Sequence, residues 1–226
     1  MILEQKIARS VELLQHVFDE TGPDRTAVAW TGGKDSTVAL FLWRQVLRAR
    51  EGTDAVLRAV NLDTGLKFPE ILAFRDRMAR EWEVAVTVAR PVVDPAAYPV
   101  AQNTVDCCRD LKILPLKQAV ADTGLDVLLT GVRGDENAER RDRPVRESRS
   151  DPDHVLIHPL LHWSEMDIWS FHMQEGLPYC ELYDQGYRSL GCMPCTTLPG
   201  TEGEERSGRN PDKEAHMDQL RALGYF

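Results

Sequence analysis

The stretch Ala27-Val28-Ala29-Trp30-Thr31-Gly32-Gly33-Lys34-Asp35-Ser36-Thr37-Val38-Ala39-Leu40 decides the fold of this chain. It begins as a short apolar run, turns through two adjacent glycines, and continues as an apolar segment with no breaker before Arg50. This pattern predicts a strand, a tight turn and a helix. Gly32 and Gly33 allow positive φ and let the backbone approach a ligand closely.

The turn has the chemistry of a phosphate-binding site. Unpaired N–H groups and the helix dipole favour an anion at the start of a helix. Lys34 adds a positive charge, and Ser36 and Thr37 add hydroxyl donors. The spacing differs from G-x-x-x-x-G-K-[ST], because the glycines are adjacent and Lys34 follows them directly. The residues alone leave an ordinary β–α turn as the alternative.

The composition is that of a globular protein. The chain has 226 residues, 42% of them hydrophobic and 28% charged, enough for one large domain or a domain with a lobe. No apolar run approaches the roughly 20 residues of a membrane helix, and residues 1–6 lack a signal-peptide layout. We therefore expect a cytoplasmic protein without membrane contact. The formal charge of −9 argues against broad nonspecific binding to nucleic acid but permits a local basic patch.

Strand and helix patterns alternate through the first 131 residues. Strands are expected over residues 27–30, 55–60, 84–88 and 126–131, and helices over 2–19, 34–50, 68–82 and 111–122. This alternation predicts an α/β fold with a Rossmann-like, parallel twisted sheet and helices on both faces. Asp63, Thr64 and Gly65 follow the second strand, and Gly131 and Arg133 follow the fourth. They are expected at the sheet edge where ligands collect.

Beyond residue 132 the pattern changes. We expect a single domain over residues 1–226, with a nucleotide-binding core over about 20–135, an arginine-rich loop over about 136–153, and a C-terminal lobe and tail over about 154–226. The outer arginines of the loop have three open roles: contact with DNA or RNA phosphates, contact with a protein, or exposure to solvent. Ser164 to Asp167 predicts a capped helix start, and residues 177–209 predict an irregular lobe.

Four of the five cysteines form two close pairs. Cys107 and Cys108 are adjacent, and Cys192 and Cys195 form a C-x-x-C. Four thiolates suit a [4Fe–4S] cluster or a tetrahedral zinc ion. Zinc usually takes two C-x-x-C knuckles, so the adjacent pair favours the cluster; zinc, a redox C-x-x-C and unrelated core cysteines remain open. Cys180 fits neither pair.

Further motifs occur along the chain in a fixed order. After residues 31–36 they are residues 62–70, 107–112, 130–133, 159–163 with 167–169, 182–187, 191–196 and 205–209. Together they resemble the phosphoadenosine phosphosulfate (PAPS) reductase family. The turn itself resembles the S-G-G-K-D-S signature of the PP-loop ATP pyrophosphatases, with Thr31 in place of the first Ser. The cysteine pattern resembles the iron–sulfur branch, which includes the adenylylsulfate (APS) reductases.

This resemblance implies the PP-loop ATP pyrophosphatase fold and a set of site residues. Cys107, Cys108, Cys192 and Cys195 would hold a [4Fe–4S] cluster. An adenine nucleotide would contact Thr31, Gly32, Gly33, Lys34, Asp35, Ser36, Thr37, Asp63, Thr64, Gly65, Gly131, Arg133, Arg206 and Arg209. Four of these, Lys34, Asp35, Asp63 and Arg133, would be catalytic. Asp63 or Asp35 would help to place Mg²⁺, and Lys34 and Arg133 would stabilise charge on the leaving pyrophosphate.

One departure from the family pattern bears on the reaction. The reductases carry a catalytic cysteine in a C-terminal Glu-Cys-Gly-Leu-His-type motif, and residues 210–226 contain no cysteine. The resemblance therefore favours an ATP pyrophosphatase that transfers sulfur, like the iron–sulfur component of bacterial DNA phosphorothioation systems. It implies a cysteine desulfurase or another sulfur-transfer partner and a DNA or RNA acceptor. The alternatives are an APS/PAPS reductase that produces sulfite, and a nucleotide- or cluster-binding subunit without activity.

Overall fold

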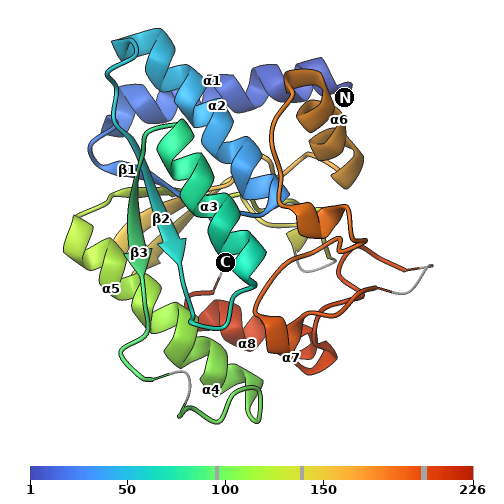
Figure 1. Cartoon of the computed structure of the whole chain (residues 1–226). Helices are drawn as coiled ribbons and strands as arrows, with labels where there is room; N and C mark the ends of the chain where they lie inside the picture. The colour runs from blue at the N-terminus through green and yellow to red at the C-terminus, as the bar shows by residue number, and fades with distance from the viewer. Residues whose placement is uncertain (95–96, 138–139, 200–202, 226) are drawn as a thin grey trace.

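The computed structural model describes residues 1–94, 97–137, 140–199 and 203–225 (Figure 1). The elements over the first half are α1 (Leu3–Thr21), β1 (Thr26–Ala29), α2 (Lys34–Glu51), β2 (Leu57–Leu62), α3 (Pro69–Glu81), β3 (Val84–Ala89) and α4 (Thr104–Cys108). They continue with α5 (Leu114–Thr123), β4 (Val127–Leu129), β5 (Arg146–Ser150), β6 (Asp153–Ile157), α6 (Glu165–Glu175), α7 (Pro211–Ala215) and α8 (Met217–Ala222). Short turns of π-helix (Arg109–Ile113) and 3₁₀-helix (Glu181–Tyr183, Met193–Cys195) complete the set.

The strands form one sheet in the order β3-β2-β1-β4-β6-β5. All neighbouring pairs are parallel except β5 and β6, which are antiparallel. The expected α/β fold is thus confirmed as a mostly parallel sheet. The chain order reverses between β1 and β4, the place where α/β sheets open a crevice at the carboxyl ends of their strands.

Helices cover both faces of the sheet, as Figure 1 shows. Alternate residues of β1 point to opposite faces. Val28 joins a core with α1, α2, α3 and α6, whereas Ala27 and Ala29 join a second core with α5. Because both sides of β1 are buried, its sequence is apolar throughout instead of alternating.

One strand, β5, lies in the region that the sequence marked as a loop, and a second, β6, begins at its end. The expectation of an irregular segment is wrong for β5, and β6 had not been expected. The charged residues of β5 conceal it, since an edge strand tolerates charge and shows no apolar alternation. Arg140 and Arg143 are also buried, in ion pairs with Glu136 and Glu147, so these two outer arginines are not solvated.

The C-terminal part follows the expectation more closely. The described residues of the range 177–209, which leave out 200–202, contain only short 3₁₀ turns and isolated bridges. The residues that follow form two short helices, α7 and α8. Met217 and Leu220 of α8 pack with Cys108 and Ile113, which places the tail against the first cysteine pair.

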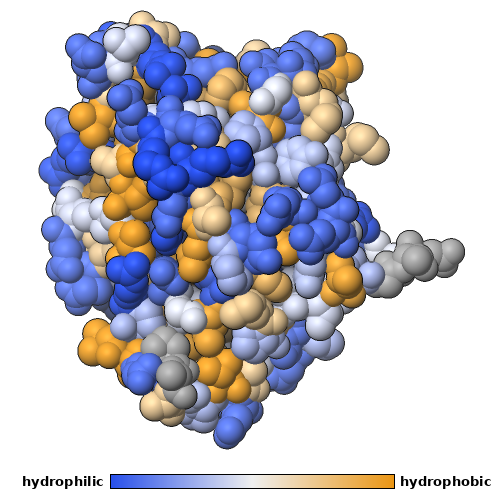
Figure 2. All heavy atoms as spheres, in the orientation of Figure 1, coloured by the Kyte–Doolittle hydropathy of each residue, from blue (hydrophilic) through white to orange (hydrophobic). Residues whose placement is uncertain are grey.

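The outer surface mixes hydrophilic and hydrophobic side chains over the face drawn in Figure 2. Exposed hydrophobic residues such as Val92 and Val93, which follow β3, are scattered in the manner normal for folded proteins. Within the ranges that the structure describes, no helix is both long and apolar enough to cross a bilayer.

Candidate active site

The turn between β1 and α2 lies at the carboxyl edge of the sheet. Gly32 has φ of 81°, a conformation that glycine adopts at little cost. The Ser36 hydroxyl donates to the Gly33 carbonyl at 3.0 Å and accepts from the Thr31 N–H at 3.2 Å. These bonds fix the turn and direct the start of α2 toward the crevice.

The end of β4 is pressed against this turn at Gly131. A Cβ atom at Gly131 would lie 2.6 Å from the Ser36 nitrogen, closer than real Cβ contacts allow. Only glycine therefore lets the two segments meet here. The same approach brings Arg133, two residues further on, beside Lys34 and Asp35, as the sequence predicted from the strand end.

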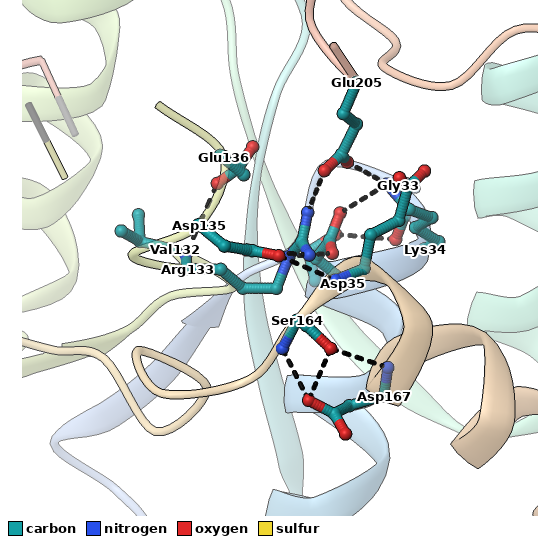
Figure 3. A network of polar contacts seen from close by, with 12 residues as sticks. Gly33, Lys34, Asp35, Val132, Arg133, Asp135, Glu136, Ser164, Asp167 and Glu205 are labelled. Carbon is teal, nitrogen blue, oxygen red and sulfur yellow. Dashed lines mark hydrogen bonds and ion pairs between the residues drawn. The ribbon is translucent and has the colours of Figure 1, made fainter. Parts of the chain in front are cut away.

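Two buried cations and three carboxylates converge beside the turn (Figure 3). The Lys34 ammonium and the Arg133 guanidinium both contact the Glu205 carboxylate. Arg133 Nε lies 2.7 Å from Asp35 Oδ1, and its Nη1 lies 3.0 Å from Asp135 Oδ1. Burial acts to lower the pKa of Lys34 and of Arg133, but Asp35 and Glu205 outweigh it and raise both pKa values. Both side chains are therefore cationic.

A second layer of ion pairs surrounds the first. Glu136 contacts Arg140 and lies 3.4 Å from Arg206 Nη1, and Arg206 Nη2 lies 2.7 Å from Glu214 Oε1. Burial would raise the pKa of Glu136, but Arg140 and Arg206 hold it below the ordinary value. Arg206, predicted as a nucleotide ligand, thus lies at the site with its charge balanced by carboxylates.

A cavity of about 140 Å³ opens between these groups. Its lining includes Thr31, Gly33, Lys34, Asp35, Ser36, Gly131, Arg206 and Arg209, all predicted as nucleotide ligands, together with Val132, Glu136, Arg140, Tyr183, Ser189, Leu190, Tyr225 and Ala29. Pockets for drug-sized ligands span roughly 300–1,000 Å³. The cavity therefore has the size for a phosphate group and not for a complete nucleotide.

Predicted ligands that do not line this cavity include Thr37, Asp63 and Gly65. The Thr37 hydroxyl is fully buried and bonds to the Gly33 carbonyl and to the Trp30 indole. Asp63 accepts the Gly65 N–H at 3.1 Å and lies 3.5 Å from Arg90. Asp63 and Gly65 thus form their own turn at the next strand end, where the Asp63 carboxylate is occupied.

The two cysteine pairs approach each other from distant parts of the chain. Cys107 and Cys108 belong to α4, and Cys192 and Cys195 bound a 3₁₀ turn; all four are buried. Burial, together with the other three thiols, raises the pKa of Cys107. Thr64 links the strand edge to this group through a contact of 3.2 Å between its hydroxyl and Cys192 Sγ. Among the described residues, however, no three His, Cys, Asp or Glu side chains stand in an arrangement that holds a metal ion.

Cations surround the cysteines. Lys67 bridges to Cys192 through the backbone, and Lys112, Lys213 and Arg209 are buried nearby. In the part of the chain that the structure describes, none of the four is ion-paired to a carboxylate. Burial would raise the pKa of Cys192, but Lys112 and Lys67 lower it to about 6. The region carries a surplus of positive charge that favours thiolates or another anion.

Sequence reasoning missed three residues at the site. Glu205 was quoted only as part of a motif, yet it joins the two central cations. The Tyr183 hydroxyl accepts the Lys34 N–H at 3.0 Å, and His172 Nε2 lies 3.0 Å from the Lys34 carbonyl. Tyr183 stood in the quoted motif of residues 182–187, but no periodicity connects position 172 with position 34, because only packing of α6 on α2 brings them together.

Comparisons with known proteins identify the family of this chain. The phosphoadenosine phosphosulfate reductase domain matches residues 25–198. The chain belongs to this family. Within the family it is 30% identical to the adenosine 5'-phosphosulfate reductase of Allochromatium vinosum, over 92% of this chain and 81% of that protein. It is 35% identical to the corresponding enzyme of Neisseria meningitidis serogroup B, over 66% of this chain and 64% of that protein. The chain thus spans slightly less than two thirds of the Neisseria enzyme.

A further relative has a different name. The sulfate adenylyltransferase subunit 2 of Shewanella frigidimarina is 25% identical over 99% of this chain and 97% of that protein. The relatives of this chain therefore include proteins named for reduction of a sulfonucleotide and one named for adenylyl transfer.

Solved structures of low identity share the fold. A PAPS reductase of Candida auris in complex with phosphate has a TM-score of 0.64 and 19% identity, over 83% of this chain and 96% of that one. The FMN adenylyltransferase of Candida glabrata with FAD and pyrophosphate has a TM-score of 0.70 and 17% identity, over 98% of this chain and 84% of that one.

Proposed function

We propose that this protein binds ATP with its phosphates at the turn of residues 31–36 and cleaves it between the α and β phosphates for sulfur transfer. Pyrophosphate leaves in the first step, and AMP is released when sulfur displaces it from the acceptor. The observation that carries the proposal is the convergence of Lys34 and Arg133, both buried, on one carboxylate beside the start of α2. Two fixed cations and a helix N-terminus meet the needs of a phosphate chain.

The chemistry follows from the charges. Cleavage between the α and β phosphates builds negative charge on the leaving pyrophosphate. Lys34 and Arg133 would stabilise that charge from positions fixed before the reaction, which is the most effective form of electrostatic catalysis. An acceptor oxygen would take the adenylyl group, and sulfur would then displace AMP. Asp63 or Asp35 would help to position Mg²⁺; each is already in contact with a cation, Asp63 with Arg90 and Asp35 with Lys34 and Arg133.

Assay of the purified protein for AMP and pyrophosphate tests the proposal. Lys34→Ala and Asp35→Ala should each lower the rate by at least about a hundredfold, the usual effect of removing one fixed charge-stabilising group. Lys117→Ala is the matched control, because Lys117 pairs with Asp151 at the surface. Absence of both products from the native protein with ATP and Mg²⁺ would exclude the proposal.

Reduction of APS or PAPS to sulfite is the second candidate, favoured by the names of the relatives. It needs a thiol that attacks sulfur. No cysteine lines the cavity at the turn or the adjoining cavity of about 90 Å³ among the described residues. Burial also raises the pKa of Cys180, which makes it a poor nucleophile. Sulfite formed from APS with thioredoxin, and lost in Cys180→Ser, would favour this candidate; nucleotide binding without any product would favour a binding subunit.

We also propose that Cys107, Cys108, Cys192 and Cys195 hold a [4Fe–4S] cluster. The donor set supports this, because the four thiols are reduced and buried. They also lie close enough that, in addition to burial, the other three raise the pKa of Cys107. The cations around them support it too, because a cluster held by four thiolates is an anion. When bound, the cluster would supply a centre that holds or passes sulfur, and the four residues would join α4 to the C-terminal lobe.

Metal analysis of anaerobically prepared protein tests this assignment. Iron and acid-labile sulfide should be present in the native protein and lost in Cys107→Ser. Cys180→Ser is the control, because Cys180 lies among Glu181, Glu70 and Asp184 and away from the other thiols; it should keep its iron. Stoichiometric zinc in place of iron would contradict the assignment.

The source and the acceptor of sulfur are proposed by family resemblance: a cysteine desulfurase or similar protein as donor, and DNA or RNA as acceptor. Because Arg140 and Arg143 are buried in ion pairs, a nucleic acid would meet the exposed Arg141 and Arg146 instead. Exchange of these two for Ala should reduce salt-dependent binding of nucleic acid; unchanged binding would place the acceptor elsewhere.

A further inference from the structure

Glu205 takes the position that a phosphate group needs. One of its carboxylate oxygens contacts the Lys34 ammonium and the other contacts the Arg133 guanidinium. The side chain is 8% exposed, and Figure 3 shows it reaching down from the C-terminal lobe to the turn. Both cations are thus occupied by an anion that belongs to the chain itself.

The size of the cavity also indicates that a nucleotide cannot bind unless this part of the site changes. At about 140 Å³ it is too small for a nucleotide. Lys34, which Glu205 contacts, and Arg206, which follows Glu205 in the chain, both line it. Arg133 is held by three carboxylates: Glu205, Asp35 at 2.7 Å from its Nε, and Asp135 at 3.0 Å from its Nη1. A phosphate group that enters the site therefore has to compete with carboxylates that already hold both cations.

We propose that Glu205 is an internal competitor of the phosphate ligand: a polyphosphate binds by displacing its carboxylate from Lys34 and Arg133, and the segment of residues 203–209 moves aside with it. The proposal rests on the proposed binding of nucleotide phosphates at the turn. Glu205 would then set the affinity of the site for phosphate ligands, because each such ligand has to displace the same carboxylate before it binds.

Binding calorimetry with inorganic pyrophosphate and with ATP tests the proposal. Glu205→Gln keeps the shape of the side chain and removes its charge. It should tighten both ligands by about tenfold or more, and by the same factor, since the displacement cost is common to them. Glu204→Gln is the matched control: it makes the same change in net charge at an exposed neighbour and should leave both affinities unchanged.

Each result separates the alternatives. Unchanged or weaker pyrophosphate binding in Glu205→Gln would overturn the proposal, and weaker binding would mean that Glu205 helps to hold the ligand or its metal ion. If Glu205→Gln does not fold, Glu205→Asp serves instead. Its shorter carboxylate cannot span both cations, so a smaller tightening is expected, and none would contradict the proposal. Tighter pyrophosphate without any ATP binding would support the competitor role while excluding the proposed function; no pyrophosphate binding to either protein would exclude both.

Discussion

At the scale of single residues, the site depends on how closely β4 approaches the turn. Arg133 was expected on the same rim as the turn because it follows a strand end, and the structure brings it and Lys34 to one carboxylate. Thr37 and Asp63 were also predicted as nucleotide ligands, but the Thr37 hydroxyl bonds within its own segment and Asp63 contacts Gly65 and Arg90. A motif fixes which residues lie at an edge; the rotation of each side chain depends on its neighbours.

Gly131→Ala should separate the two segments. The added Cβ would lie 2.6 Å from the Ser36 nitrogen, so the turn must shift, and we expect loss of nucleotide binding and destabilisation of about 1–3 kcal/mol. Calorimetric titration and urea unfolding measure the two effects. Gly124→Ala is the control: it meets no atom within 4 Å at φ of 63° and should cost about 1 kcal/mol with binding intact. Normal binding by Gly131→Ala would refute the close-approach argument.

At the scale of elements, the sequence predicted the cap of a helix but not an edge strand. The start of α6 was predicted from Ser164 and Asp167, and both halves of the capping box are present. Strand β5 was missed, because Arg146-Glu147-Ser148-Arg149-Ser150 has no apolar alternation. A cap is a local interaction between residues three positions apart, whereas β5 exists only because β6 offers it a partner.

Ser164→Ala should destabilise the protein by about 1 kcal/mol, the usual effect of losing an N-cap. Its hydroxyl accepts the Asp167 N–H at 3.2 Å, and alanine leaves that donor without a partner. Chemical denaturation measures the change. Ser170→Ala removes the same atom from an exposed position inside α6 and should be neutral or stabilising by a few tenths of a kcal/mol. Equal effects of the two variants would contradict a capping role.

At the scale of the whole molecule, buried histidines make stability depend on pH. His158 joins β6 to the surrounding ion pairs, and His172 joins α6 to α2. Burial lowers the pKa of both below the ordinary value of 6.5. The unfolded chain therefore takes up protons near pH 6.5 that the folded chain does not.

The free energy of unfolding should accordingly fall as the pH drops from 7.5 through about 6.5 to 5.5. The pKa of Glu147 is lowered too, chiefly through His158 and Arg143 against the effect of burial; its contribution is lost only as the pH falls below about 4.5, outside this window. Urea unfolding at several pH values measures the slope. His172→Gln should flatten it, and His16→Gln, at an exposed position, should not. A slope that stays the same in His172→Gln would disprove the assignment.

The sequence by itself determined the α/β class, the strand, turn and helix around Gly32 and Gly33, and the residues at the strand ends. These follow from local patterns: apolar runs, adjacent glycines, and charges placed just after a strand. Only the tertiary structure decided that Glu205 joins Lys34 and Arg133, that Arg140 and Arg143 are buried, and that buried cations lie close to the cysteines. Such contacts join positions up to 171 residues apart, and their energies depend on burial and on the balance of charge, which exist only once the chain is packed.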